Sequence, residues 1–265
     1  RMGELKMKRK ITTAISILLI IASMFITGCG SKAATGQPNK SIKKYTISTD
    51  ATYAPFEFEK DNKYVGIDID LLNEISKLEG FEYELKPMDF KGIIPALTSN
   101  QIDGAIAGIT ITDERKQALD FSDGYFESGL SLVVSKDNNS IKSVDDLMGK
   151  KVAIKKGTAG ATFAEENKDK YKLSIKYFDD TPSMFQEVVN GNADATFEDY
   201  PVIAYEVSVD PNSKLKIAVD KIYKAYYGFT VKKGSNKELI DMFNDGLKKL
   251  KDNGEYDKIV KKYIK

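Results

Sequence analysis

The sequence predicts an α/β fold with mainly parallel sheets, because short strand patterns alternate with helix patterns along most of the chain. Phe81, Tyr83 and Leu85 alternate with charged residues, which is typical of a half-buried strand. Just before them, apolar residues in the segment 71–78 recur at helical spacing. Further strand and helix patterns then follow one another toward the C-terminal region.

The predicted elements have local signals. Asp68 is a candidate N-cap for the helix that carries Leu71, Leu72, Ile75 and Leu78 on one face. The next helix is indicated by Ile93, Ile94 and Leu97, and short apolar runs predict strands at 105–109, 152–154 and around Ile175.

Start and stop signals define the later helices. Thr181 is a candidate cap, with Pro182 in the first turn of the helix and Gly191 just past its end. The segment 239–264 is predicted to be helical, with a break at Asn253-Gly254.

Two segments resemble each other. When Asp103 is aligned with Asp194, Ala107-Gly108 falls opposite Glu198-Asp199, and both segments leave the carboxyl end of a predicted strand. Ligands of α/β sheets bind at such ends, so two facing lobes would form a cleft there. The alternative is that the similarity of the two segments has no structural meaning, since Asp in a turn before a strand is common.

The N-terminal region has the layout of a secretory signal peptide. Basic residues at 8–10 precede an uncharged apolar run, Ile11–Phe25, and the sequence I-T-G-C ends at Cys29. A cysteine after a small residue resembles a bacterial lipobox, which implies cleavage before Cys29 and lipidation of its thiol. Two acyl chains anchor a protein stably, whereas one is marginal. The alternative is a chance cysteine beside a membrane anchor.

The composition limits the possible functions. Residues 1–28 are expected to be the signal peptide and 29–43 a flexible, polar tether. Without residues 1–28 the chain has 35 basic and 38 acidic residues, so no basic excess favours nucleic acid. The chain has no histidine, which excludes histidine-based triads, metal sites and proton shuttles. No metal or cofactor is expected.

Several motifs together carry a family resemblance that covers residues 44–265. They are D-A-T-Y-A-P-F-E-F (50–58), Y-V-G-I-D-I-D-L (64–71), K-P-M-D-F-K-G-I-I-P-A-L (86–97), A-G-I-T-I-T-D-E-R (107–115), D-F-S-D-G-Y (120–125) and N-G-E-Y-D-K-I (253–259). The chain resembles the extracellular solute-binding proteins of the polar amino acid type (family 3), above all the glutamine-binding proteins of ABC importers.

The resemblance implies a two-lobed, periplasmic-binding-protein-like (type II) Venus flytrap. Lobe 1 would contain residues 44–126 and 225–265, and lobe 2 residues 127–224. Two hinge strands would join the lobes, and a ligand between them would stabilise the closed state. The resemblance also implies a monomer that works with a membrane permease.

The resemblance assigns the two charged ends of an amino acid ligand. Arg115, at an expected helix N-terminus, would bind the α-carboxylate with Thr110 and the backbone N–H of Ala159. Asp199 would bind the α-ammonium, together with the carbonyl of Gly108 in the segment that starts at Ala107. On spacing alone, Arg115 would pair with a neighbouring acid on a solvated helix and Asp199 would be a helix cap.

The resemblance also assigns the side-chain end of the site. Tyr53 and Phe90 would be aromatic walls, although each alone is more typical of core or surface packing. Lys155 would donate a hydrogen bond to a glutamine side chain and Asp50 would accept one. A neutral amide satisfies both groups, whereas a basic side chain is repelled by Lys155 and a carboxylate by Asp50.

Two positions depart from the family pattern. Glu198 stands where the glutamine-binding proteins have a histidine, and it could be paired by Lys155 or Lys156. It could also shift the preference toward asparagine or a basic amino acid. Ala159 replaces a glycine, but only its backbone is used.

The sequence therefore predicts a lipid-anchored receptor on the extracytoplasmic side of the cell membrane, which captures L-glutamine and delivers it to a permease without catalysis. Other polar amino acids, including glutamate, are alternative ligands. Two further alternatives are an enzyme on the same fold, in which Asp50 and Glu198 would do acid–base work, and a sensor domain.

Overall fold

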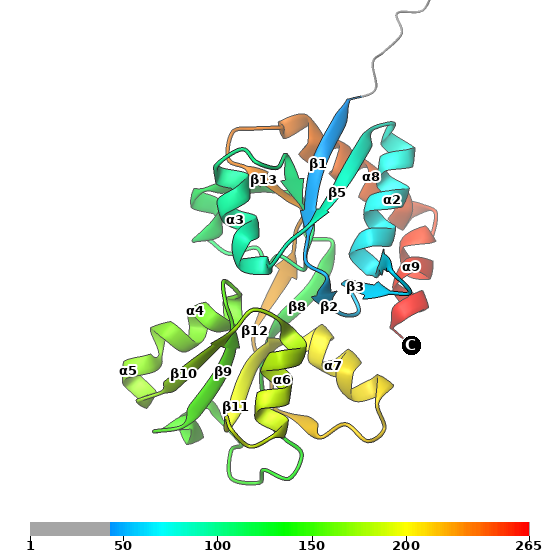
Figure 1. The fold of residues 1–265 in the computed structure, drawn as a ribbon. Coiled ribbons are helices and arrows are strands. Elements are labelled where there is room, and N and C mark those ends of the chain that lie inside the picture. The colour runs from blue at the N-terminus through cyan, green and yellow to red at the C-terminus, as the bar shows by residue number, and fades with distance from the viewer. Residues whose placement is uncertain (1–42, 265) are drawn as a thin grey trace, which may run out of the picture. The chain divides into compact units, whose positions relative to one another are not determined.

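Two five-stranded sheets organise the computed structural model, which describes residues 43–264 (Figure 1). The first sheet contains, in spatial order, β5 (Glu82–Pro87), β1 (Lys44–Thr49), β6 (Gly104–Ala105), β13 (Thr230–Lys232) and β7 (Leu119–Phe121). The second contains β10 (Ser174–Phe178), β9 (Lys151–Lys155), β11 (Ala195–Asp199), β8 (Phe126–Ser135) and β12 (Leu215–Tyr227). A small sheet is formed by β2 (Thr52–Tyr53), β3 (Glu57–Lys60) and β4 (Lys63–Val65).

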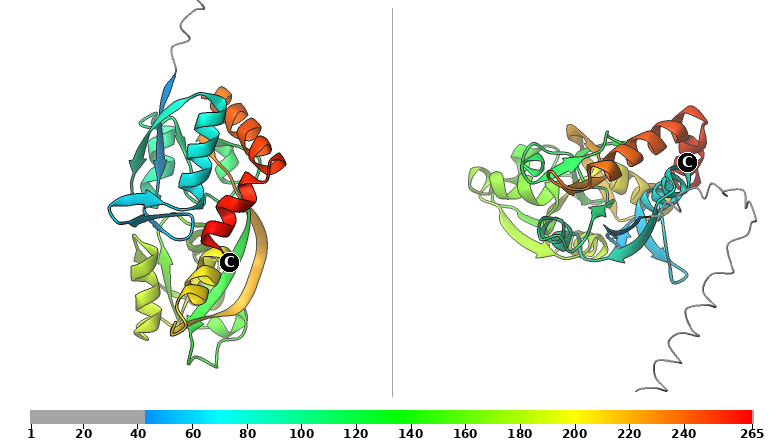
Figure 2. Two further views of the ribbon diagram at one scale, coloured as in Figure 1. Left: turned by 90° about the vertical axis from the view of Figure 1, so that its right-hand side faces the viewer. Right: turned by 90° about the horizontal axis from the view of Figure 1, so that it is seen from above.

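Helices flank each large sheet, so the predicted α/β fold is confirmed (Figures 1 and 2). Lobe 1 contains α2 (Ile67–Glu79), α3 (Phe90–Thr98), α8 (Lys237–Asp252), α9 (Glu255–Tyr263) and the 3-10 helix η2 (Arg115–Gln117). Lobe 2 contains α4 (Ala159–Glu166), α5 (Lys168–Tyr171), α6 (Thr181–Val189), α7 (Tyr200–Val209) and the 3-10 helix η3 (Val144–Leu147). The break predicted between the last two helices is confirmed, because Gly254 follows α8 with a left-handed φ of 77°.

The prediction of mainly parallel sheets is wrong. In the first sheet β1 is parallel to β5 and β6, but β13 runs antiparallel to β6 and β7. In the second, β9 is parallel to β10 and β11, while β8 runs antiparallel to β11 and β12. The cause is the chain path: β8, β12 and β13 belong to the segments where the chain passes between the lobes, and they enter the sheets in the opposite direction.

The strands β8 and β12 connect the lobes. They pair with each other, Phe126 opposite Tyr227 and Ser128 opposite Ala225. The ring of Phe56 packs edge-on against Phe126 and Tyr227, with centroid distances of 4.9 and 5.0 Å. We propose that the lobe boundary lies in this paired segment, which gives lobe 1 residues 44–126 and 225–265 and lobe 2 residues 127–224.

The resemblance between the segments around Asp103 and Asp194 reflects a repeated structural role. The Asp103 carboxylate accepts a hydrogen bond from the Thr46 N–H of β1 at 2.8 Å. The Asp194 carboxylate accepts one from the Lys151 N–H of β9, also at 2.8 Å. Asp103 therefore links the start of β6 to β1, and Asp194 links the start of β11 to β9 in the same way. The carboxyl ends of β6 and β11 consequently lead into the same cleft.

Several local predictions need correction. Gly66, not Asp68, is the N-cap of α2, and Asp68 lies buried inside the first turn. Leu78 is 44% exposed, so it does not share the buried face of this helix. The cap of α6 is Asp180, whose carboxylate accepts the N–H of Ser183, and Thr181 is the first helical residue. Gly191 does follow that helix, with a φ of 72°.

The strand predicted at 105–109 is shorter than expected. Only Gly104–Ala105 pairs as a strand, although the residues that follow are buried. Gly108 has a left-handed φ of 52°, which turns the chain away from the sheet and toward the cleft. After this turn, Thr110 forms an isolated β-bridge with Tyr227 at the end of β12.

Candidate functional site

One small cavity between the lobes brings together most of the predicted ligand-binding residues. Eight of the eleven line it: Tyr53, Phe90, Gly108, Thr110, Arg115, Lys155, Ala159 and Asp199. Thr158 completes the lining. Asp50 and Glu198 reach the lining residues through hydrogen bonds, whereas Ala107 is fully buried beside Gly108 and does not line the cavity.

The cavity has a volume of about 10 Å³, which is about the space of one water molecule. The side chain of Lys155, which is 2% exposed, lies among the lining residues. An amino acid can therefore enter only if the lobes separate and the Lys155 side chain moves.

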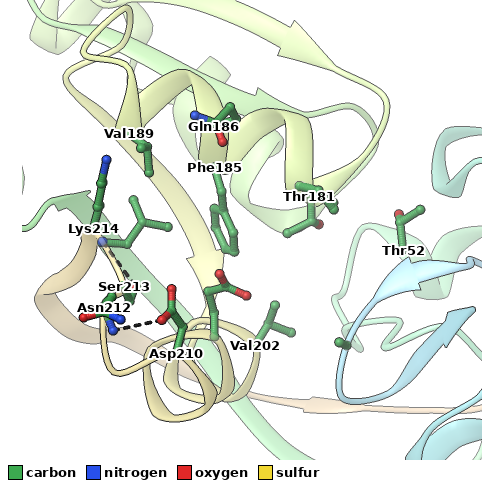
Figure 3. Close-up of a pocket in the computed structure, with 14 residues that line it drawn as sticks. Thr52, Thr181, Phe185, Gln186, Val189, Val202, Asp210, Asn212, Ser213 and Lys214 are labelled. Carbon is green, nitrogen blue, oxygen red and sulfur yellow. Dashed lines mark hydrogen bonds between the residues drawn. The ribbon is translucent and has the colours of Figure 1, made fainter. Parts of the chain in front are cut away.

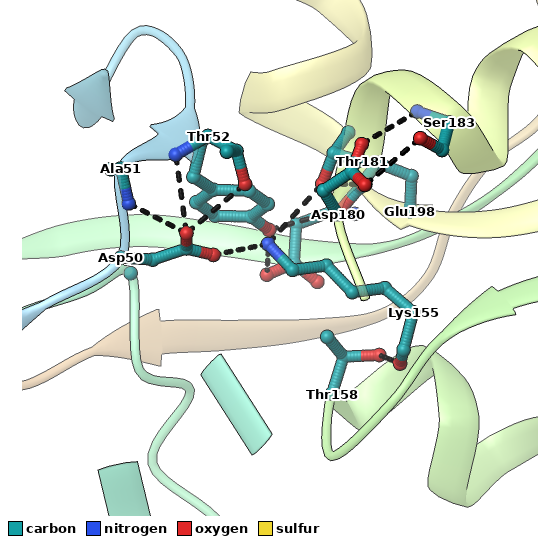
Figure 4. Close-up of polar contacts among 12 residues, drawn as sticks. Asp50, Ala51, Thr52, Lys155, Thr158, Asp180, Thr181, Ser183 and Glu198 are labelled. Carbon is teal, nitrogen blue, oxygen red and sulfur yellow. Dashed lines mark hydrogen bonds and ion pairs between the residues drawn. The ribbon is translucent and has the colours of Figure 1, made fainter. Parts of the chain in front are cut away.

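Asp50 is held in place by its own loop (Figure 4). Its Oδ1 accepts hydrogen bonds from the N–H of Ala51 at 2.6 Å and from the N–H and hydroxyl of Thr52 at 3.1 and 3.0 Å. Its Oδ2 accepts a hydrogen bond from the Nζ of Lys155, which belongs to the other lobe. The carboxylate thus has a fixed orientation toward lobe 2 before any ligand is considered.

Lys155 reaches from the end of β9 into a pocket of acids and aromatic rings. Besides Asp50, its Nζ contacts the Thr181 hydroxyl at 3.5 Å. It lies 4.9 Å from the centroid of the Tyr53 ring and 5.7 Å from that of Phe90. Both residues predicted as aromatic walls therefore lie beside the Lys155 ammonium, in a position that accepts a cation.

Glu198 and Asp199 form a buried acidic pair at the end of β11. The Tyr53 hydroxyl lies 3.0 Å from Glu198 Oε1 and 3.0 Å from Asp199 Oδ2, and the Tyr227 hydroxyl donates to Asp199 Oδ2 at 2.7 Å. Burial and the charge of Asp199 raise the pKa of Glu198 to about 7. Burial also raises the pKa of Asp199 above its ordinary range.

These contacts settle two alternatives from the sequence. Asp199 does occupy the N-cap position of α7, but its side chain makes no capping hydrogen bond and faces the cavity instead. Lys156 does not pair with Glu198, because its Nζ contacts Asp179 at 3.0 Å. Asp179 also contacts Lys91 of lobe 1 at 2.5 Å, so an exposed ion pair bridges the lobes beside the site.

Arg115 bridges the lobes at the other end of the cavity. Its Nη1 donates to the Thr110 carbonyl at 2.8 Å and its Nη2 to the Gly157 carbonyl of lobe 2 at 3.0 Å. Its guanidinium lies 5.7 Å from the Phe90 ring centroid. Burial lowers the pKa of Arg115 from its ordinary value. The solvated pairing with a neighbouring acid is not observed.

The helix N-terminus expected at Arg115 belongs instead to another segment. Arg115 starts only the three-residue helix η2. Ala159 starts α4, whose N-cap Thr158 accepts the N–H of Ala161 at 3.1 Å. Since the first N–H groups of a helix have no partner within it, Ala159 offers a backbone donor beside the Arg115 guanidinium.

Sequence reasoning missed Thr158, Thr181 and Tyr227. Thr181 was interpreted as a cap, and its hydroxyl in fact lies 3.5 Å from both Lys155 Nζ and Glu198 Oε2. Tyr227 ends the hinge strand β12 and reaches Asp199 only because that strand crosses between the lobes. No local sequence signal marks these contacts.

A larger groove of about 560 Å³ lies elsewhere, between β2 of lobe 1 and α6 and α7 of lobe 2 (Figure 3). Its lining includes the apolar side chains of Phe185, Val189 and Val202. None of the eleven predicted ligand-binding residues lines it. The small cavity, in contrast, is lined by Arg115 of lobe 1 and by Lys155 and Asp199 of lobe 2.

None of the helices in the described part of the chain is long and apolar enough to cross a membrane.

Comparisons with known proteins agree with the fold. The arginine-binding extracellular protein ArtP of Bacillus subtilis is 34% identical over 94% of this chain and 97% of its own length. The glutamine-binding protein GlnH of the same organism is 32% identical over 95% and 96%.

A solved structure of an ancestral arginine-binding protein bound to arginine is 44% identical, with a TM-score of 0.78 over 84% of this chain and 98% of that one. The structure of an ancestral arginine-binding protein bound to glutamine is also 44% identical, with a TM-score of 0.76 over 83% and 97%. Residues 45–265 match the family of bacterial extracellular solute-binding proteins, family 3, and the chain belongs to that family.

Proposed function

We propose that this protein captures a polar amino acid, with L-glutamine as the preferred ligand, between its lobes and delivers it to the membrane permease of an ABC importer. The observation that carries the proposal is that groups of opposite charge line one cavity. Arg115 and the start of α4 line it together with the buried carboxylate of Asp199. These groups are complementary to an α-carboxylate and an α-ammonium.

The side-chain end supports a ligand with both a donor and an acceptor. Asp50 and Lys155 lie on opposite lobes and hydrogen-bond each other. A carboxamide inserted between them would accept from Lys155 and donate to Asp50, so neither buried group would lose its partner. Glutamate would place a carboxylate against Asp50, which disfavours it.

Isothermal titration tests this proposal. The chain from residue 30 onward, cleared of bound ligand by unfolding and refolding, is titrated with glutamine, glutamate, asparagine and arginine. Tight binding of glutamine with weak binding of glutamate supports the assignment of Asp50 and Lys155. Binding to none of the four amino acids contradicts the proposal.

A basic amino acid is the second candidate, because of the position of Lys155 Nζ. This nitrogen already occupies a cation site made by Asp50, Thr181 and the rings of Tyr53 and Phe90. With every acid ionised, the site holds three acids and two bases and has a charge of −1. That charge matches a cationic ligand, whereas a site with a protonated Glu198 is neutral and matches a zwitterion.

The choice between the two candidates is therefore predicted to depend on Glu198 and on pH. Because burial raises the Glu198 pKa to about 7, the side chain changes charge near neutrality. Arginine affinity is expected to rise by about tenfold from pH 6 to pH 8, since the ionised fraction of a carboxyl with a pKa of about 7 rises about tenfold over this range. Glutamine affinity should change much less. Both are measured by titration calorimetry at the two pH values.

Glu198→Gln should remove this pH dependence and lower arginine affinity at pH 8 while leaving glutamine affinity nearly unchanged. Glu165→Gln, at a residue of α4 outside the cavity lining, is the control. An arginine affinity of Glu198→Gln that still rises with pH would show that another group controls the selectivity.

We propose further that Cys29 carries a lipid anchor that holds the protein at the outer face of the cell membrane. Cys29, the predicted signal peptide at 1–28 and the tether at 29–43 lie outside the described residues, apart from Lys43. Radiolabelled palmitate is expected to label the wild-type protein in cells but not Cys29→Ala. Equal labelling of both would contradict the anchor.

We also propose that the protein works as a monomer and does not transform its ligand. The paired charges of the cavity support ligand capture. Recovery of the bound amino acid unchanged, by mass spectrometry after long incubation, tests the absence of catalysis.

A further inference from the structure

Two buried carboxyl groups behind the amino acid site have oxygens without hydrogen-bond partners. Glu57, the first residue of β3, is fully buried, and neither of its side-chain oxygens has a partner. Asp68, in the first turn of α2, is also fully buried, and its Oδ1 has none. An ionised carboxylate without a partner in the interior is costly, so these three oxygens need an explanation.

The second oxygen of Asp68 is strongly bound. Its Oδ2 accepts the backbone N–H of Gly108 at 2.8 Å and the hydroxyl of Tyr125 at 2.8 Å. Gly108 belongs to the turn that lines the amino acid cavity, and Tyr125 lies next to the hinge strand β8. Asp68 therefore holds both the cavity wall and the hinge against lobe 1.

The charged and titratable groups that face Glu57 give it no cation of its own. They are Asp68 from α2, Asp50 from the loop after β1, Lys155 from β9 and Tyr125. Lys155 is engaged with Asp50. Two of the four facing groups are acids, so an ionised Glu57 would face more negative than positive charge.

A single proton between Glu57 and Asp68 removes this repulsion between neighbouring acids. The Asp68 N–H donates to the carbonyl of Phe56, the residue before Glu57, at 2.9 Å, so the two residues lie side by side and their carboxyls interact. Two carboxyl groups can hydrogen-bond only when one of them carries a proton. Burial and the neighbouring Asp68 raise the pKa of Glu57 well above its ordinary value of 4.5. Burial raises the pKa of Asp68 to about 6. Such a pair titrates as a unit.

We propose that Glu57 is protonated and donates a hydrogen bond to the ionised Asp68, which makes Glu57 a positioning residue for the amino acid site. Glu57 then acts through Asp68, whose other oxygen fixes the N–H of Gly108 and so the cavity wall. The effect on ligand binding rests on the proposed function, whereas the proton between the two carboxyls does not.

Infrared spectroscopy of the full chain at pH 7 detects the proton directly. A protonated carboxylic acid has a carbonyl stretch distinct from that of a carboxylate. The wild-type spectrum is expected to contain a stronger protonated-acid band than that of Glu57→Gln, whose remaining band comes from Glu198 with its pKa of about 7. Glu59→Gln, at an exposed position of the same strand, is the matched control and should keep the full wild-type band. Equal bands in wild type and Glu57→Gln, or a wild-type spectrum without any such band, overturn the proposal.

The stability of the wild-type protein should fall as pH rises above 4.5. Below that pH Glu57 is protonated in both the folded and unfolded chain. Above it, the unfolded chain loses the proton while the folded chain retains it, so Glu57 contributes a rise of about tenfold per pH unit to the unfolding equilibrium constant until the folded pair titrates. Other buried acids such as Glu198 add to the slope equally in all three proteins. Urea denaturation at several pH values measures this constant for wild-type, Glu57→Gln and Glu59→Gln proteins.

Glu57→Gln should have a flatter pH dependence than the other two, because its amide donates to Asp68 without titrating. Equal slopes in all three proteins would contradict the proposal, and so would a wild-type stability that depends on added sodium or potassium, since a bound cation would then satisfy the oxygens. If Glu57→Gln does not fold, the infrared spectrum of Glu198→Gln at pH 7 still decides, because a protonated-acid band there supports the proposal and its absence overturns it.

Ligand affinity separates this proposal from the proposed function. Glu57→Gln should keep amino acid affinity within about twofold of wild type at pH 7, because the donor to Asp68 remains. Glu57→Leu, whose side chain has no donor, should lower amino acid affinity clearly more than Glu57→Gln does. A wild-type protein that binds no amino acid contradicts only the proposed function, whereas equal affinities of the Gln and Leu variants contradict the positioning role.

Discussion

Replacing Arg115 with alanine is expected to weaken amino acid binding by roughly 30- to 3,000-fold. Removal of one partner of a buried, hydrogen-bonded charge pair costs about 2 to 5 kcal/mol of binding, and each 1.4 kcal/mol is about tenfold. In the proposed site Arg115 supplies the cationic fork for the ligand carboxylate, and it also donates to the Gly157 carbonyl of lobe 2. The variant therefore loses a ligand contact and a contact that holds the lobes together. Calorimetric titration with the preferred amino acid measures the loss.

Two controls make the Arg115 result specific. Arg115→Lys keeps the charge but loses the planar fork, so it should still bind markedly more weakly than wild type. Lys116→Ala removes a neighbouring exposed cation and should bind normally. Arg115→Ala with wild-type affinity would show that the carboxylate is bound elsewhere.

The second large effect is expected at Lys155. Lys155→Met should lower the free energy of unfolding by roughly 3 to 5 kcal/mol, because it leaves the buried Asp50 carboxylate without its cation. Urea denaturation measures the change. The double variant Lys155→Met, Asp50→Asn should recover most of it, since no ionised group is then left unpaired.

Lys156→Met is the matched control for Lys155→Met. Its side chain is 39% exposed and pairs at the surface with Asp179, so its removal should change stability little. A Lys155→Met variant as stable as this control would mean that Asp50 finds another partner or takes up a proton.

The fold was predictable because its signals are local or repeated. The apolar spacing in α2 and the turn residues Asn253-Gly254 mark helices directly. The matching aspartates, Asp103 and Asp194, mark the same structural role in each lobe, and both carry it out with a 2.8 Å hydrogen bond. The antiparallel strands were not predictable in this way, since strand direction depends on a chain path that no local pattern contains.

The site was predictable only in part, for a similar reason. The family resemblance brought Arg115, Lys155 and Asp199 into one site, and the cavity contains all three. It did not indicate Glu57, because an acidic residue on a short strand looks exposed in the sequence. Asp68 was misinterpreted as a cap, since its true partners, Gly108 and Tyr125, lie 40 and 57 residues away.

The position of β13 has a consequence for how the protein is made. This strand lies between β6 and β7 in the first sheet, yet it follows the whole of lobe 2 in the sequence. The ribosome must therefore synthesise β13 and α8 before the sheet that starts with β1 can be completed. All strands of the lobe 2 sheet lie between Phe126 and Tyr227, so they are synthesised before β13. The lobe whose synthesis begins first is thus the last to complete its sheet, so β6 and β7 have no strand between them until the chain past lobe 2 has been made.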